Sequence, residues 1–151
     1  MFRRVVAVFV VSSTFAFAGP PKAVTELAAT VDGAKRSDGK KECSFTVEKP
    51  DCAMAVKISC ATPMMKYSYT MTLPLSKLDP KKSVYQSNAG GFSGSHGVEV
   101  TATSAVIETV TDEGQKTSGD VVVLAFGTAP EDEKRAKKFV ATLAAAKKAC
   151  K

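Results

Sequence analysis

The sequence has 151 residues, of which 44% are hydrophobic and 24% charged, and its formal net charge is +6 at pH 7. This length suffices for one domain with a hydrophobic core, and no internal repeat or second domain is visible. Because the positive charge is small and the lysines are scattered, solubility explains it better than a preference for anionic cell wall or lipid headgroups, and nucleic acid is excluded as the expected partner.

The first 18 residues have the features of a secretory signal peptide. Arg3 and Arg4 form a positive start, residues 5–11 are apolar, and the small-x-small motif at 16–18 precedes Gly19. The apolar run is too short to span a bilayer of about 30 Å. No cysteine follows the cleavage site, so a lipid anchor is not expected. Removing 18 of the 151 residues leaves 133, and export to the periplasm or beyond is predicted.

Residues 19–41 begin with prolines and then become charged and glycine-rich, which predicts either a short helix at about 24–34 or a flexible lead-in. From residue 42 onward, apolar and polar residues alternate between turn signals, and this pattern predicts seven strands. Their ranges are 42–48, 52–61, 64–73, 83–86, 98–103, 106–111 and 121–126. The last of them is apolar on both faces, so it is expected at the centre of a sheet, covered on one side by a helix.

The sequence PEDEKRAKKFVATLAAAKKAC predicts a final helix. Thr128 is the expected N-cap, Pro130 lies in the first turn, and the acidic residues at 131–133 are placed where the helix dipole favours anions. The acidic cluster therefore indicates a helix start and not a set of catalytic carboxylates. Because alanine dominates and tryptophan is absent, the helix is expected to pack on a sheet and not on a membrane or nucleic acid.

Four cysteines in an exported chain, Cys43, Cys52, Cys60 and Cys150, indicate two disulfides. No CxxC pair is present and the chain has one histidine, so neither a zinc site nor a redox-active pair is expected. Strand alternation and the helical stripe Phe139, Leu143, Ala146 and Cys150 direct all four thiols toward the core. On a straight strand Cys52 and Cys60 would be about 26 Å apart, too far for a bond between them. Cys150 is therefore left with Cys43, Cys52 or Cys60, and we favour Cys52–Cys150 with Cys43–Cys60.

The order of seven strands followed by one helix is that of the pleckstrin-homology superfold. The segments YSYTMTLPLSKLDPKKSVYQ and GDVVVLAF also occur here, followed by a lysine- and alanine-rich helix that ends in cysteine. With these features the sequence resembles PH-like domains of uncharacterised exported bacterial proteins. The resemblance covers residues 42–151. It implies an α+β fold, an antiparallel barrel of about seven strands capped by a C-terminal α-helix. It also implies a binding platform without catalytic residues. Binding of phosphoinositides is not implied, because the first hairpin loop, EKPDC at 48–52, contains no arginine.

The loop NAGGFSGSHG at 88–97 is the candidate binding loop, because it is long and carries Phe92 at its tip. His96 lies beside Ser93 and Ser95, which raises the hypothesis of a serine hydrolase. The GxSxG elbow is missing, however, and an exposed loop histidine is the favoured interpretation.

Other side chains on the strands raise the hypotheses of a metal site or a groove. The methionines at 54, 64, 65 and 71 do not form an MxxM cluster, so they are expected to fill the core and not to bind copper(I). Tyr67 and Tyr69 share one strand face, where they either line a groove or pack.

These features predict a periplasmic or secreted, non-catalytic binding or scaffold module for a protein or cell-envelope component, without cofactor or metal. The alternative is a small carrier that encloses an apolar ligand or lipid between the barrel and the helix. A hydrolase that uses His96 is the third hypothesis.

Overall fold

The computed structural model describes residues 19–151, so the predicted signal peptide at 1–18 lies outside the described residues. The described part contains two α-helices and nine strands. They are α1 (Lys22–Val31), β1 (Lys35–Ser37), β2 (Glu42–Lys49), β3 (Ala53–Ala61), β4 (Lys66–Pro74), β5 (Val84–Ser87), β6 (His96–Thr101), β7 (Ile107–Thr111), β8 (Lys116–Gly119), β9 (Val121–Ala125) and α2 (Pro130–Ala149). Short 3₁₀ turns lie at Leu75–Lys77 and Ala89–Gly91.

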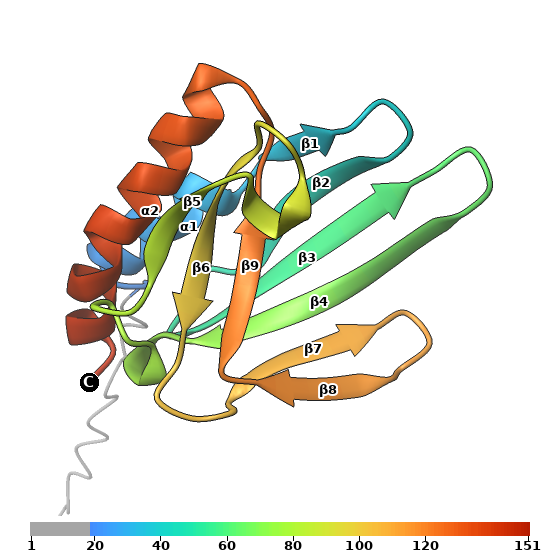
Figure 1. Ribbon diagram of the computed structural model, residues 1–151. Coiled ribbons are helices and arrows are strands. Elements are labelled where there is room, and N and C mark those ends of the chain that lie inside the picture. Colours follow the sequence, from blue (N-terminus) through green and yellow to red (C-terminus); the bar gives the residue numbers. More distant parts are fainter. Residues whose placement is uncertain (1–18) are drawn as a thin grey trace, which may run out of the picture.

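The strands form two antiparallel sheets (Figure 1). The larger has six strands in the order β1-β2-β3-β4-β7-β8, and the smaller has three in the order β5-β6-β9. The α+β class and the C-terminal helix are confirmed, but the sheets do not close into a barrel. Two strands, β1 and β8, were missed because their sequences, KRS and KTSG, are polar and become strands only by pairing with β2 and β7.

The central position expected for residues 121–126 is wrong, because β9 lies at the edge of the three-stranded sheet. Its apolar character on both faces has a local cause. Leu124 is buried in the core, whereas Ala125 faces the turn at Ala89–Gly91 and is covered by it. Val121, the first residue of β9, is 45% exposed.

The core lies between the two sheets and the helices. The rings of Phe45 on β2 and Phe126 after β9 meet edge to face, with centroids 5.6 Å apart. From α2, the residues that face the core follow a helical stripe with no exposed surface; they are Ala136, Phe139, Leu143 and Ala146. The predicted inward stripe of the last helix is therefore confirmed, and burial of this stripe holds α2 in place.

Both predicted disulfides are present. Cys43 on β2 is bonded to Cys60 on β3, directly opposite it in the ladder, with Cα atoms 4.1 Å apart. Cys52, just before β3, is bonded to Cys150 at the end of α2, with Cα atoms 5.4 Å apart. The pairing is the one that the strand and helix patterns favoured.

The helix ends differ in detail from the sequence expectations. Helix α1 is the helical alternative for residues 19–41, and its buried side chains lie against α2. The N-cap of α2 is Ala129 and not Thr128, since the Asp132 carboxylate accepts the Ala129 N–H at 3.1 Å and so satisfies the helix start. Neither helix in the described residues is long and apolar enough to cross a membrane.

The expectation that the methionines fill the core holds for only two of the four. Met54 and Met71 are buried, but Met64 and Met65 are exposed. The strand was expected to begin at Met64, whereas β4 begins at Lys66. Residues 62–65 instead form the β3–β4 turn, which carries both methionines away from the core.

Candidate functional site

The candidate binding loop at 88–97 is a turn held by internal hydrogen bonds. Ser95 is buried, and its hydroxyl lies 2.9 Å and 2.8 Å from the carbonyl oxygens of Ala89 and Phe92. Phe92 is half-buried under the Arg36 guanidinium, whose carbon lies 4.2 Å from the ring centroid. Ser93 is exposed. The structure thus brings Phe92 against Arg36 of β1, and of the two serines it buries Ser95 and exposes Ser93.

His96 is the first residue of β6 and is half-buried, so the expectation of an exposed loop histidine is wrong. Its Nδ1 lies 2.8 Å from the Tyr85 hydroxyl, and Lys137 of α2 approaches the Tyr85 ring. On the same helix, the hydrogen bond and ion pair between Glu133 and Lys137 lower the pKa of Glu133 and raise the pKa of Lys137. Because the Ser95 hydroxyl is bonded to backbone oxygens, this cluster lacks the serine–histidine contact of a hydrolase.

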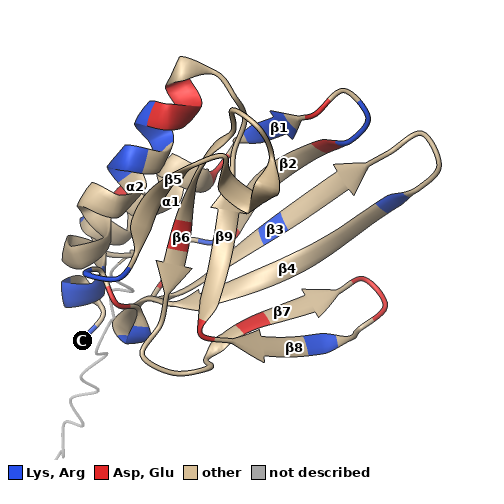
Figure 2. Ribbon diagram, in the orientation of Figure 1, with Lys and Arg blue, Asp and Glu red and all other residues tan. Residues whose placement is uncertain are grey.

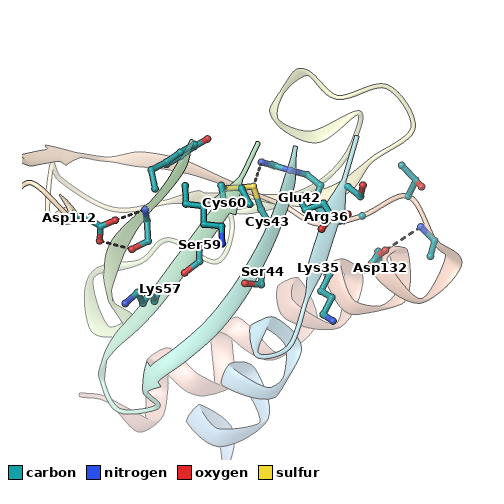
Figure 3. Close-up of a pocket in the computed structure, with 18 residues that line it drawn as sticks. Lys35, Arg36, Glu42, Cys43, Ser44, Lys57, Ser59, Cys60, Asp112 and Asp132 are labelled. Atoms are coloured by element: carbon teal, nitrogen blue, oxygen red, sulfur yellow. Dashed lines mark hydrogen bonds between the residues drawn. A yellow bond between two sulfur atoms is a disulfide. The ribbon is translucent and has the colours of Figure 1, made fainter. Parts of the chain in front are cut away.

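An open groove of about 1030 Å³ is lined by residues of β1 to β4, by Asp112 and by the start of α2 (Figure 3). Antiparallel register places Lys35, Ser44, Ser59 and Ser68 opposite one another on β1 to β4, so their side chains share one face. Figure 3 shows Lys35, Ser44 and Ser59 on one side of the strands and the Cys43–Cys60 disulfide on the other. We call the serines Ser44, Ser59 and Ser68 the hydroxyl row.

Asp112, in the turn between β7 and β8, closes one end of the groove. Its two carboxylate oxygens accept hydrogen bonds from the Ser68 hydroxyl and the Ser68 backbone N–H, at 2.5 Å and 2.6 Å. These two hydrogen bonds lower the pKa of Asp112, and the bond from the Ser68 hydroxyl has the larger effect. The nearby Lys57 ammonium acts in the same direction. The carboxylate is therefore held in one orientation beside the hydroxyl row.

The start of α2 forms the other end of the groove, beside Lys35. This close approach depends on Gly127, because a Cβ added there would lie 2.5 Å from an Asp132 oxygen and 3.0 Å from the Lys35 carbonyl oxygen. A side chain at this position would separate β1 from the helix start.

The groove offers hydrogen bonds and charge to a ligand. Neighbouring strands are about 4.8 Å apart, so the row from Lys35 to Ser68 extends over roughly 14 Å. Lys35 and Lys57 supply cations and Asp112 supplies an anion. Within residues 19–151 no cluster of three or more His, Cys, Asp or Glu residues is arranged to hold a metal ion. The arrangement suits binding of an extended polar molecule.

The hydroxyl row was missed at the sequence level, although a signal for it exists. Strand alternation assigns Ser44, Ser59 and Ser68 to outward faces, but only the pairing register aligns them. Tyr67 and Tyr69 lie on the inner face, opposite Cys60 and Ile58, where they pack beside the core. Burial raises the pKa of the Tyr69 hydroxyl.

Comparison of the chain with protein-family models, with curated proteins and with solved structures finds no match. The resemblance to PH-like domains therefore stays a prediction. What can be inferred about function rests on the groove, the turns and the surface chemistry of the described residues.

Proposed function

We propose that the protein is an exported, non-catalytic binding module that holds a polar component of the cell envelope along the hydroxyl row of the groove. The observation that carries this function is the hydroxyl row, which lies between the Lys35 ammonium and the Asp112 carboxylate. Glycan and peptide chains of an envelope polymer present hydroxyl, amide and carboxylate groups, and these groups complement such a row.

Rigidity of the row supports this function. The serines belong to β2, β3 and β4, which are interior strands of the six-stranded sheet. The Cys43–Cys60 pair is the next register position after Ser44–Ser59, so the disulfide joins the two strands directly beside the row. Groups held in place before binding lose little conformational freedom when a ligand arrives. Two disulfides are also typical of proteins in oxidising compartments, which supports export.

The alternative of a carrier for an apolar ligand finds less support. The space between the sheets and helices is occupied by core side chains such as Phe45, Phe126 and Phe139. The groove is open, and its lining includes serine, lysine and aspartate side chains.

The binding function can be tested by NMR titration of the ¹⁵N-labelled protein with soluble peptidoglycan fragments, that is, glycan chains that carry short acidic peptides. We expect the largest amide shifts at residues of the hydroxyl row and at Asp112. No shift, or shifts confined to other surfaces, would contradict the proposed function.

A matched pair of serine variants sharpens this test. Ser59→Arg places a long side chain in the groove, and we expect it to weaken fragment binding at least tenfold. Ser118→Arg introduces the same charge on the same sheet face, but on β8 and outside the groove, and should leave binding unchanged. Equal binding by both variants would show that the fragments do not occupy the groove.

A further inference from the structure

Two hairpin turns lie side by side at one end of the six-stranded sheet. They are residues 38–41, between β1 and β2, and residues 62–65, between β3 and β4. They are neighbours because Glu42, the first residue of β2, pairs with Ala61, the last residue of β3. Figure 1 shows both turns projecting beyond the three-stranded sheet. We call these two turns, with Lys66 at the start of β4, the hairpin tip.

Two methionines occupy the outermost part of the hairpin tip. Met64 is 94% exposed and Met65 is 61% exposed, whereas Met54 and Met71 are at most 5% exposed. Hydrogen bonds of Thr62 hold the turn in shape. Its N–H donates to the Met65 carbonyl oxygen at 2.8 Å, and its hydroxyl oxygen accepts the Met65 N–H at 3.1 Å. The turn therefore presents two large apolar side chains to the surroundings.

Lysines surround these methionines. Lys40 and Lys66 are exposed, and Lys41 lies with its ammonium 5.1 Å from the centroid of the Tyr67 ring. Figure 2 shows these cations on the β1–β2 turn and at the start of β4. The Asp38 carboxylate is directed into its own turn, where it accepts the backbone N–H groups of Lys40 and Lys41. Within the tip, Lys40, Lys41 and Lys66 outnumber Asp38, so the tip carries a net positive charge.

An apolar centre surrounded by lysines fits the surface of an anionic lipid bilayer. We infer that the hairpin tip docks on such a bilayer, with Met64 and Met65 at the acyl boundary and Lys40, Lys41 and Lys66 beside the lipid phosphates. The tip is at the opposite end of β2 and β3 from the EKPDC loop at 48–52. The tip adjoins the groove, because Lys66 also lines it, but Met64 and Met65 lie outside the groove lining.

Tryptophan fluorescence provides a direct test, because the chain contains no tryptophan. In Met64→Trp the indole becomes the only tryptophan and reports on the tip. On vesicles of equal phosphatidylglycerol and phosphatidylcholine we expect a blue shift and quenching by lipids with brominated acyl chains. Ser104→Trp, in the exposed connection between β6 and β7, is the control and should show neither effect. If the indole of Met64→Trp is neither shifted nor quenched, docking by the tip is overturned.

Vesicle co-sedimentation tests the lysines and methionines in the unlabelled protein. We expect Lys40→Glu/Lys41→Glu and Met64→Ser/Met65→Ser each to reduce the bound fraction on phosphatidylglycerol vesicles at least tenfold. The charge-matched control Lys134→Glu/Lys138→Glu changes two exposed lysines of α2 and should reduce binding less than twofold. Equal losses in the two lysine variants would mean that only net charge matters, which overturns a specific tip.

The lipid specificity and the groove give separate readouts. Binding should be lost on vesicles of phosphatidylcholine alone and should weaken steeply with salt, because the charges of the tip are screened. Ser59→Arg should leave vesicle binding intact, so failure of the groove and failure of the tip are distinguishable. If the wild-type protein binds neither kind of vesicle, docking of the tip on lipid is overturned, and a protein partner remains as the occupant of the tip.

Discussion

Cys52 and Cys150 are 98 positions apart in the sequence, yet their disulfide brings the end of α2 to the start of β3. The backbone at Cys52 is fixed from a second side, because its carbonyl oxygen accepts the Leu75 N–H at 2.9 Å. The C-terminal helix is therefore tied covalently to the sheet whose core-facing side chains it helps to bury.

Removal of this bond is expected to destabilise the protein strongly. Cys52→Ala/Cys150→Ala should lower the free energy of unfolding by about 4 kcal/mol, because the closed loop is long and its constraint on the unfolded chain is correspondingly large. Urea denaturation under non-reducing conditions measures this change. Cys43→Ala/Cys60→Ala opens a shorter loop, with a separation of 17 residues, and its loop term is smaller, at about 3 kcal/mol. A loss under about 1 kcal/mol for the first variant would contradict the expected role of the bond.

Gly97 on β6 is expected to tolerate no side chain. A Cβ at this position would overlap the Leu124 carbonyl oxygen and lie 2.5 Å from the Ala89 Cβ. Gly97→Ala should therefore cost about 2 to 3 kcal/mol of stability, as overpacked sites do. Thermal unfolding compares it with Gly119→Ala, where the nearest atom is the Val121 oxygen at 3.7 Å and little change is expected. Equal stability of the two variants would show that the β6–β9 pair can separate at no cost.

Phe139 is the largest side chain of the α2 stripe and has no exposed surface. Phe139→Ala should lower the unfolding free energy by about 3 to 5 kcal/mol, because the removed ring leaves a cavity. Lys138→Ala changes the adjacent, exposed residue and should alter stability by less than about 0.5 kcal/mol. Guanidinium denaturation measures the unfolding free energy of both variants. If Phe139→Ala is as mild as its control, the Phe139 ring does not hold α2 on the core.

The Asp112 carboxyl should titrate below its ordinary range, because Ser68 hydrogen-bonds to its charged form and so lowers its pKa. Its folded-state pKa is lowered, so its contribution to stability is present above the unfolded-state pKa and is lost as pH falls through the folded-state pKa. Ser68→Ala removes the first and largest of the causes and should raise the Asp112 pKa, as followed by carboxyl carbon NMR. The pKa of Asp38 is lowered by the backbone N–H groups of Lys40 and Lys41 and should not move in this variant.

The sequence predicts the position of a residue where local periodicity decides it, and not where pairing with another strand decides it. Strand alternation identified the inward face of Cys43 and Phe45, and both are buried. The same reasoning missed β1 and β8, since polar edge segments have no periodic apolar signal and become strands through hydrogen bonds to a neighbour. It also placed β9 at the centre of a sheet. A strand face covered by a loop is as apolar in sequence as a face covered by a helix, so the two cases cannot be told apart.

The sequence by itself determined the α+β class, the two-disulfide framework and the inward stripe of the last helix, because periodicity and cysteine chemistry act within one element. The tertiary structure alone decided that Ser44, Ser59 and Ser68 stand in one row, that His96 meets Tyr85, and that Met64 projects beside Lys40. These relationships join residues on different strands or turns, and strand register sets such distances, which no single segment encodes.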